Sequence, residues 1–171
     1  MRWVSAHAEI LQLAQRLRAD AIVFRRWAGD LQYFPQTGTQ TPLDPELGAA
    51  ADDLRGALDA VAALAARWDE EITWLRSLDR TMPVDDIQRG HAQAREALRL
   101  ARAALEIFSR VITNPERTAL DAPYGAGAPR RVHPGAQCTW VAERADGLAR
   151  ELSMVTLRKH NLLLALPQSQ A

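Results

Sequence analysis

Histidine is the side chain best suited to acid–base or metal chemistry near neutral pH, and this 171-residue sequence has four. One of them, His91, falls on an apolar stripe with helical spacing, where it could bind a haem or metal or transfer a proton in a buried cavity. The alternative is a structural histidine that forms a hydrogen bond across the bundle or near its end. A di-iron bundle needs glutamate three residues before histidine, and no histidine here has one. We therefore expect no metal site and no cofactor.

A Gly/Pro-rich segment, residues 114–135, holds a second group of candidate ligand-binding residues. They are Tyr124, Arg130, Arg131 and His133. Paired arginines beside a histidine could clamp a phosphate or a carboxylate. The alternative is a solvated loop whose arginines pair with acidic residues elsewhere in the chain.

The common catalytic signatures are missing from the sequence. It contains no H-E-x-x-H, no phosphate-binding G-x-x-x-x-G-K-[ST] and no G-x-S-x-G. Its single cysteine, Cys138, can form neither an internal disulfide nor a C-x-x-C metal site. Whether the protein is an enzyme stays open, with the balance toward a non-enzymatic role.

A basic ridge of Arg95, Arg99 and Arg102, at helical spacing, could follow the phosphates of a nucleic acid. The whole chain, however, has 21 basic and 21 acidic side chains, without the basic excess usual in polyanion-binding proteins. Residues 44–79 carry nine acidic and three basic side chains. Pairing between this acidic segment and its basic neighbours is the interpretation we favour, and nucleic acid is the alternative partner.

Four further residues indicate contact with a protein partner. Trp74 and Trp140 belong to a residue type enriched at interface hot spots. Leu163 and Leu164 belong to an apolar run that covers more than half of a helix circumference. Ordinary packing against a neighbouring helix is the alternative for Trp74.

Apolar residues repeat at alternating intervals of three and four along most of the chain, which is typical of helices packed in bundles. Proline and capping residues mark the ends of these stripes. The sequence predicts helices over residues 6–33, 45–78, 84–113 and 136–166. No segment shows the strict alternation of a half-buried strand.

These patterns predict one all-α domain over residues 1–171, an antiparallel four-helix bundle that a second copy could complete. We expect a non-enzymatic protein of the cytoplasm that works in protein–protein assembly, as a homo-oligomer or as a small subunit of a larger complex. No membrane span or cleaved leader is expected, since the longest small-apolar run is far shorter than the roughly 20 residues a span needs. The alternative function is a ligand-binding or enzymatic bundle with a site near His91 or within residues 121–135.

Overall fold

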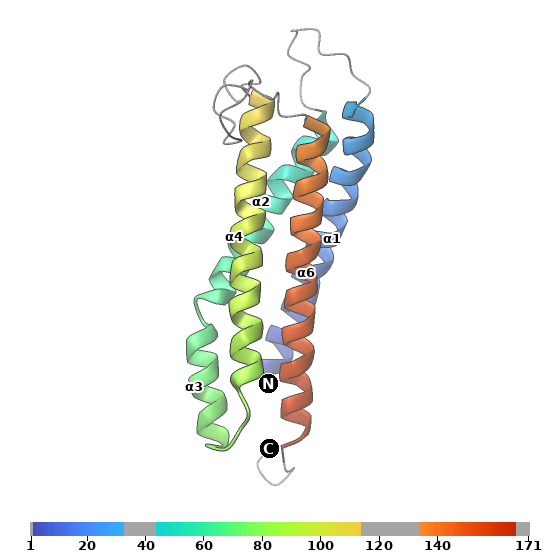
Figure 1. The fold of residues 1–171 in the computed structure, drawn as a ribbon. Helices are drawn as coiled ribbons and strands as arrows, with labels where there is room; N and C mark the ends of the chain where they lie inside the picture. The colour runs from blue at the N-terminus through green and yellow to red at the C-terminus, as the bar shows by residue number, and fades with distance from the viewer. Residues whose placement is uncertain (1, 33–43, 114–133, 167–171) are drawn as a thin grey trace, which may run out of the picture.

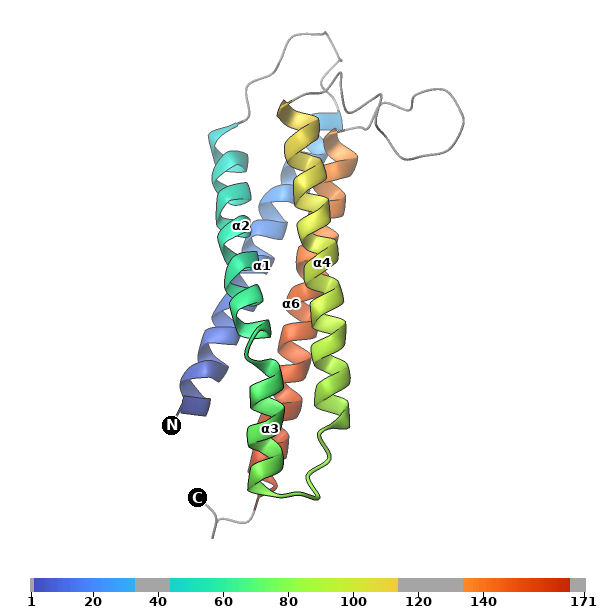
Figure 2. The same ribbon diagram turned by 90° about the vertical axis from the view of Figure 1, so that its left-hand side faces the viewer.

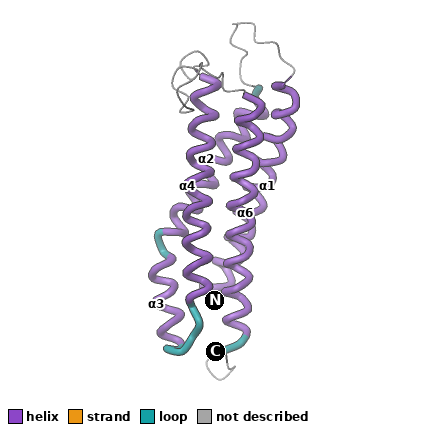
Figure 3. Tube along the Cα trace, viewed as in Figure 1, coloured by secondary structure: helices purple, strands orange, loops and turns teal. Residues whose placement is uncertain are grey.

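The computed structural model describes residues 2–32, 44–113 and 134–166, and the side chains of residues 7–29, 44–110 and 135–166. Every regular element in these ranges is a helix, and none is a strand (Figure 3). The helices are α1 (Arg2–Gln32), α2 (Pro45–Ala65), α3 (Trp68–Leu78), α4 (Asp85–Thr113) and α6 (Pro134–Leu164). The predicted all-α fold is therefore confirmed.

The helices run alternately up and down the long axis of the molecule (Figures 1 and 2). α1 and α4 run in one direction, whereas α6 and the pair α2–α3 run in the other. α6 packs closely against both α1 and α4, and α2 lies against α1 and α4. The predicted antiparallel bundle is present within one chain.

The core of the bundle is built from the predicted stripes. Every stripe residue of the first three predicted helices whose side chain is described lies buried, from Ile10 to Ala28, from Leu47 to Leu75 and from Ile87 to Phe108. On α6 the stripe is buried from Val141 to Val155, while Leu162 and Leu166 are half-buried. The three-and-four spacing thus identified the inward faces correctly.

The prediction of one continuous helix over residues 45–78 is wrong, because the helix is interrupted at Ala66 and Arg67. The Arg67 amide donates to the Leu64 carbonyl at 3.0 Å, a tight turn that ends α2. Arg95 of α4 donates to the Ala65 carbonyl at 3.1 Å and satisfies a helix-terminal acceptor. The spacing hides the break because the buried positions on its two sides stay in phase.

Three helix starts also differ from the prediction, that of α4 by a single residue, since it begins at Asp85 instead of residue 84. α1 begins at Arg2 instead of residue 6, because nothing in residues 2–5 interrupts a helix. α6 begins at Pro134 instead of residue 136, since proline lacks only a backbone donor that the first helical turn does not need.

The buried apolar residues form two separate cores. The main core joins α1, α2, most of α4 and the first part of α6, and includes the edge-to-face pair Phe24 and Phe108. The second core lies at the end of the bundle where α3 replaces α2. It consists of Ile72, Leu75, Met82, Val84, Ile87 and Val155, with Leu78, Leu162, Leu163 and Leu166 packed against it.

Candidate functional site

His91 lies in a buried polar layer between the two cores. Its side chain is 2% exposed, although it is in the second turn of α4, because α3 covers it. The imidazole stacks face to face on Trp68, with ring centroids 4.5 Å apart and planes 3° from parallel. His91 is therefore shielded from solvent, although it lies near the start of its helix.

Lys159 and Glu71 complete the buried polar layer. The Lys159 ammonium group is 1% exposed and lies 2.8 Å from Glu71 Oε2, which ties α6 to α3. The ammonium nitrogen also lies 5.8 Å from the Trp68 ring centroid, within reach of a cation–π interaction. From here on, the polar layer means Trp68, Glu71, His91 and Lys159.

Sequence reasoning missed Lys159, the only lysine of the chain. Two signals could have identified it. Position 159 falls on the three-and-four stripe of α6, between Val155 and Leu162, so that the helix pattern directs a charged side chain inward. A charged residue at such a position requires a buried counter-charge, which Glu71 supplies.

Burial determines the protonation states in the polar layer. Burial is the largest cause, and together with the positive charges of Lys159 and Arg95 it lowers the pKa of His91 to about 3. His91 is therefore a neutral imidazole at pH 7, and its Nε2 atom lies 3.9 Å from Glu71 Oε2, too far for a hydrogen bond. Burial also lowers the pKa of Lys159, whereas the carboxylate of Glu71 acts in the opposite direction.

A second buried acid lies where α1 meets α2. Asp20 is 7% exposed, and its burial together with the hydrogen bond and charge of Asp53 raises its pKa to about 8. The hydrogen bond from Asp20 and the nearby Arg16 lower the pKa of Asp53. Arg16 Nη2 lies 2.9 Å from Asp53 Oδ1. At pH 7 the two carboxyl groups thus hold one proton between them, and Asp20 carries it.

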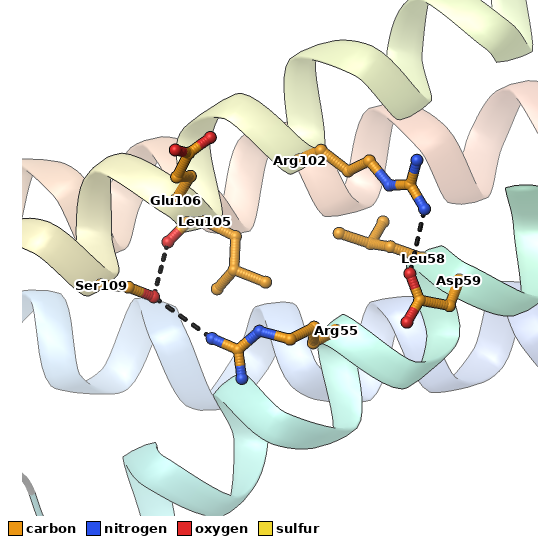
Figure 4. Close-up of a pocket in the computed structure, with 7 residues that line it drawn as sticks. All are labelled: Arg55, Leu58, Asp59, Arg102, Leu105, Glu106 and Ser109. Carbon is orange, nitrogen blue, oxygen red and sulfur yellow. Dashed lines mark hydrogen bonds and ion pairs between the residues drawn. The ribbon is translucent and has the colours of Figure 1, made fainter.

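The side of the bundle between α2 and α4 has two adjoining hollows. The first, of about 200 Å³, is drawn in Figure 4, with Leu58 and Leu105 between two arginines. There Arg102 meets Asp59 at 3.0 Å, and Arg55 donates to Ser109 at 3.3 Å (Figure 4). The second hollow, of about 470 Å³, is lined by Ala65, Ala66, Asp69, Arg95, Leu98, Arg99 and Arg102.

All three arginines of the predicted basic ridge line this second hollow, and each has an acidic neighbour. Besides the pair of Arg102 with Asp59, Arg95 lies 3.5 Å from Asp69. Arg99 binds Glu96 of its own helix at 2.5 Å. Two of the three arginines thus pair with the acidic segment 44–79, in the way that the charge pattern indicates. These ion pairs indicate a structural role for the ridge, and nucleic-acid binding stays the alternative.

Three of the four predicted interface residues lie at the same end of the bundle. Trp74 on α3 is 43% exposed, and the pair of Glu71 with Lys159 shows that this part of α3 lies beside the end of α6. There Leu163 is half-buried and Leu164 is 70% exposed. Trp140 lies at the opposite end of α6, partly buried against the main core. The candidate ligand residues Tyr124, Arg130, Arg131 and His133 lie outside the described residues.

Sequence reasoning identified only Leu164 of an exposed and largely apolar stripe on the outer face of α6, referred to below as the outer stripe. It consists of Met154, Leu157, Asn161 and Leu164, all exposed and spaced by three, four and three residues. Each follows an inward position by two residues, about 200° around the helix, and so faces away from the core. The three-and-four spacing of these outward residues is the sequence signal that could have identified the stripe. On neighbouring α1, Leu11 and Ile22 are also exposed.

In the part of the chain that the structure describes, three or more potential metal-ligating side chains (His, Cys, Asp or Glu) do not gather in any one place. None of the described helices combines the length and hydropathy that crossing a bilayer requires. In comparisons with known proteins, the chain matches no family model, no curated protein and no solved structure.

Proposed function

We propose that this protein is a non-enzymatic helical bundle that works by assembling with a second copy of itself. The observation that carries the proposal is the outer stripe, which leaves Leu157 57% and Leu164 70% exposed on an otherwise well-packed helix. Large apolar side chains that cluster on a surface are typical of protein–protein contact sites. The proposed compartment is the cytoplasm, where the buried Cys138 stays reduced.

The surface of α1 beside α6 widens this candidate interface. Leu11 and Ile22 are three helical turns apart and share one face of α1. Arg18, on the same face, donates to Ser153 of α6 at 3.1 Å, which places this face of α1 next to the outer stripe. Two neighbouring helices therefore offer apolar side chains to the same partner.

Sedimentation velocity over a series of concentrations tests the proposal. We expect a reversible dimer with a Kd on the order of 10 µM, since small interfaces give weak association. Leu157→Glu would weaken the dimer at least tenfold, because it introduces a charge into the contact. Gln12→Glu, which adds the same charge at an exposed position of α1, would leave association unchanged. A wild-type protein that stays monomeric up to millimolar concentration would contradict the proposal.

A ligand-binding bundle with its site near His91 is the second candidate, and the polar layer favours it. Strongly shifted pKa values next to charged neighbours are characteristic of functional sites. An absorbance spectrum and metal determination on protein purified from its own host test this candidate. A bound chromophore or a stoichiometric metal, lost in His91→Phe, would support it, and a metal-free sample without a chromophore would count against it.

A further inference from the structure

We infer that the second copy binds in a parallel and in-register orientation, α6 against α6, with the Asn161 side chains of the two copies paired. This inference rests on the proposed self-assembly and adds the geometry of the contact. It follows from the order of residue types along the outer stripe, from the place of this stripe on α6, and from the groups beside it.

The stripe has the residue pattern of a short coiled-coil seam. When Met154 is assigned to heptad position a, Leu157 falls at d, Asn161 at a and Leu164 at d. Leucine at d is favoured in two-stranded parallel coils, and a single asparagine at a determines register and oligomeric state.

The asparagine distinguishes the two possible orientations. In a parallel, in-register pair each residue meets its own copy, so the two Asn161 amides bind one another. In an antiparallel pair with the same span, Asn161 would face Leu157 of the other copy. Two amides would then be buried against leucine without hydrogen-bond partners, and each unsatisfied group carries a desolvation cost. The parallel pair avoids this cost.

The bundle leaves room for such a pair. The outer stripe lies opposite the core-facing side of α6, so a two-fold axis along this helix directs the cores of the two copies away from each other, while the exposed face of α1 flanks the contact. In Figure 1, α6 and α4 lie in front of α2, and the described part of α6 is not covered by another helix in that view. Ser153 and Arg158 flank the seam and face each other across it in the parallel register, and the seam ends at Met154 because the preceding d position is the exposed Arg150.

Disulfide trapping tests the orientation in the full chain. Asn161→Cys places a thiol at the proposed two-fold axis, and copper phenanthroline with oxygen serves as the oxidant. The native Cys138 does not compete, because it is fully buried and burial raises the pKa of its thiol to about 12. We expect most of the Asn161→Cys protein to become a covalent dimer at concentrations where wild type sediments as a dimer. Ser77→Cys, exposed on α3, serves as the control and would give no more than background.

The outcomes separate this inference from the proposed function. A mixture of Asn161→Cys and Leu157→Cys proteins that cross-links to each other, while Asn161→Cys does not cross-link to itself, would show an antiparallel pair and overturn the inference. A sedimenting dimer without any cross-link at position 161 would overturn it as well, while leaving self-assembly intact. A monomer at all concentrations would instead remove the proposed function.

Discussion

Around Phe24 and Phe108 the helices meet through apolar side chains, and the charged groups stay at the rim. Arg26 with Glu46 is one such pair, with both side chains about half exposed. At the other end of the bundle Lys159 is entirely buried beside Glu71. Exposed pairs contribute little to stability, whereas a buried pair is costly to form and costly to break. The first end is therefore held by packing, and the second depends on one matched pair of charges.

The buried pair lies near the start of α3. The first turn of this helix carries Asp69, Glu70 and Glu71, which suit the positive end of a helix dipole. Glu71 meets Lys159 there, and Trp68 stacks on His91. We expect α3 to exchange its amide hydrogens faster than α2, because it packs on the smaller of the two cores.

The largest expected effect tests the role of packing in the main core. Phe108→Ala removes a fully buried ring that packs edge to face on Phe24, and should lower the free energy of unfolding by roughly 3–5 kcal/mol. Ile72→Ala in the second core should cost less, about 2 kcal/mol, because that core can relax around the cavity. Urea denaturation measures both. An equal or larger loss for Ile72→Ala would show that the two ends do not differ in this way.

The next effect tests the buried pair. Glu71→Gln removes the carboxylate that lies 2.8 Å from the buried Lys159 ammonium group, and should cost about 3 kcal/mol. Adding Lys159→Met to the same chain should restore most of this loss, since replacing both partners of a buried pair is often neutral. Glu70→Gln, at the exposed neighbouring position, is the matched control and should change stability by less than about 0.5 kcal/mol. If the double variant is less stable than Glu71→Gln alone, the pair is not the feature that holds α3.

A smaller effect of opposite sign is expected from Asp20→Asn. The pKa of Asp20 is about 8 in the folded protein against 3.8 for the free side chain, so the folded state binds the proton more tightly. Stability from this group is complete below pH 3.8 and is lost as the pH rises toward 8. Asparagine does not titrate, and at pH 7 it should stabilise the fold by at least about 1.4 kcal/mol, the value of one pKa unit.

Thermal unfolding from pH 4 to pH 9 measures this effect of Asp20→Asn. The advantage of the variant should grow with pH and become constant above pH 8, as the pKa of Asp20 implies. Glu9→Gln, at an exposed position of the same helix, serves as the control for the loss of a carboxylate. An advantage independent of pH would contradict the proton shared by Asp20 and Asp53.

The smallest expected effect concerns an exposed ion pair at the edge of the main core. Arg102 and Asp59 are both about half exposed or more, so a double-mutant cycle with alanine should give a coupling energy below about 1 kcal/mol that weakens in high salt. The cycle for Lys159 and Glu71 provides the comparison. Equal coupling energies in the two cycles would show that the exposed ion pair and the buried ion pair contribute alike to stability, and would contradict the difference between the two regions.

Much of the fold could be predicted because helix periodicity is a local property. The spacing of three and four identified inward residues as different as Ala14, Trp68 and His91. The same periodicity could also have identified Lys159 as an inward residue and Leu157 as an outward one. Residue type alone, however, did not reveal that this lysine is buried or that this leucine is exposed.

The sequence by itself determined that the chain is helical, which faces turn inward, and that residues 44–79 carry the acidic charge. The tertiary structure decided which groups meet. Glu71 and Lys159 are 88 positions apart, and Asp59 and Arg102 are 43 apart, so no local pattern pairs them. The break at Ala66 and Arg67 was hidden because the buried positions on its two sides stay in phase, and because Arg95, which binds the Ala65 carbonyl at the end of α2, comes from a distant helix. Periodicity determines which side of a helix is buried, whereas the partner of each buried charge depends on how the helices pack.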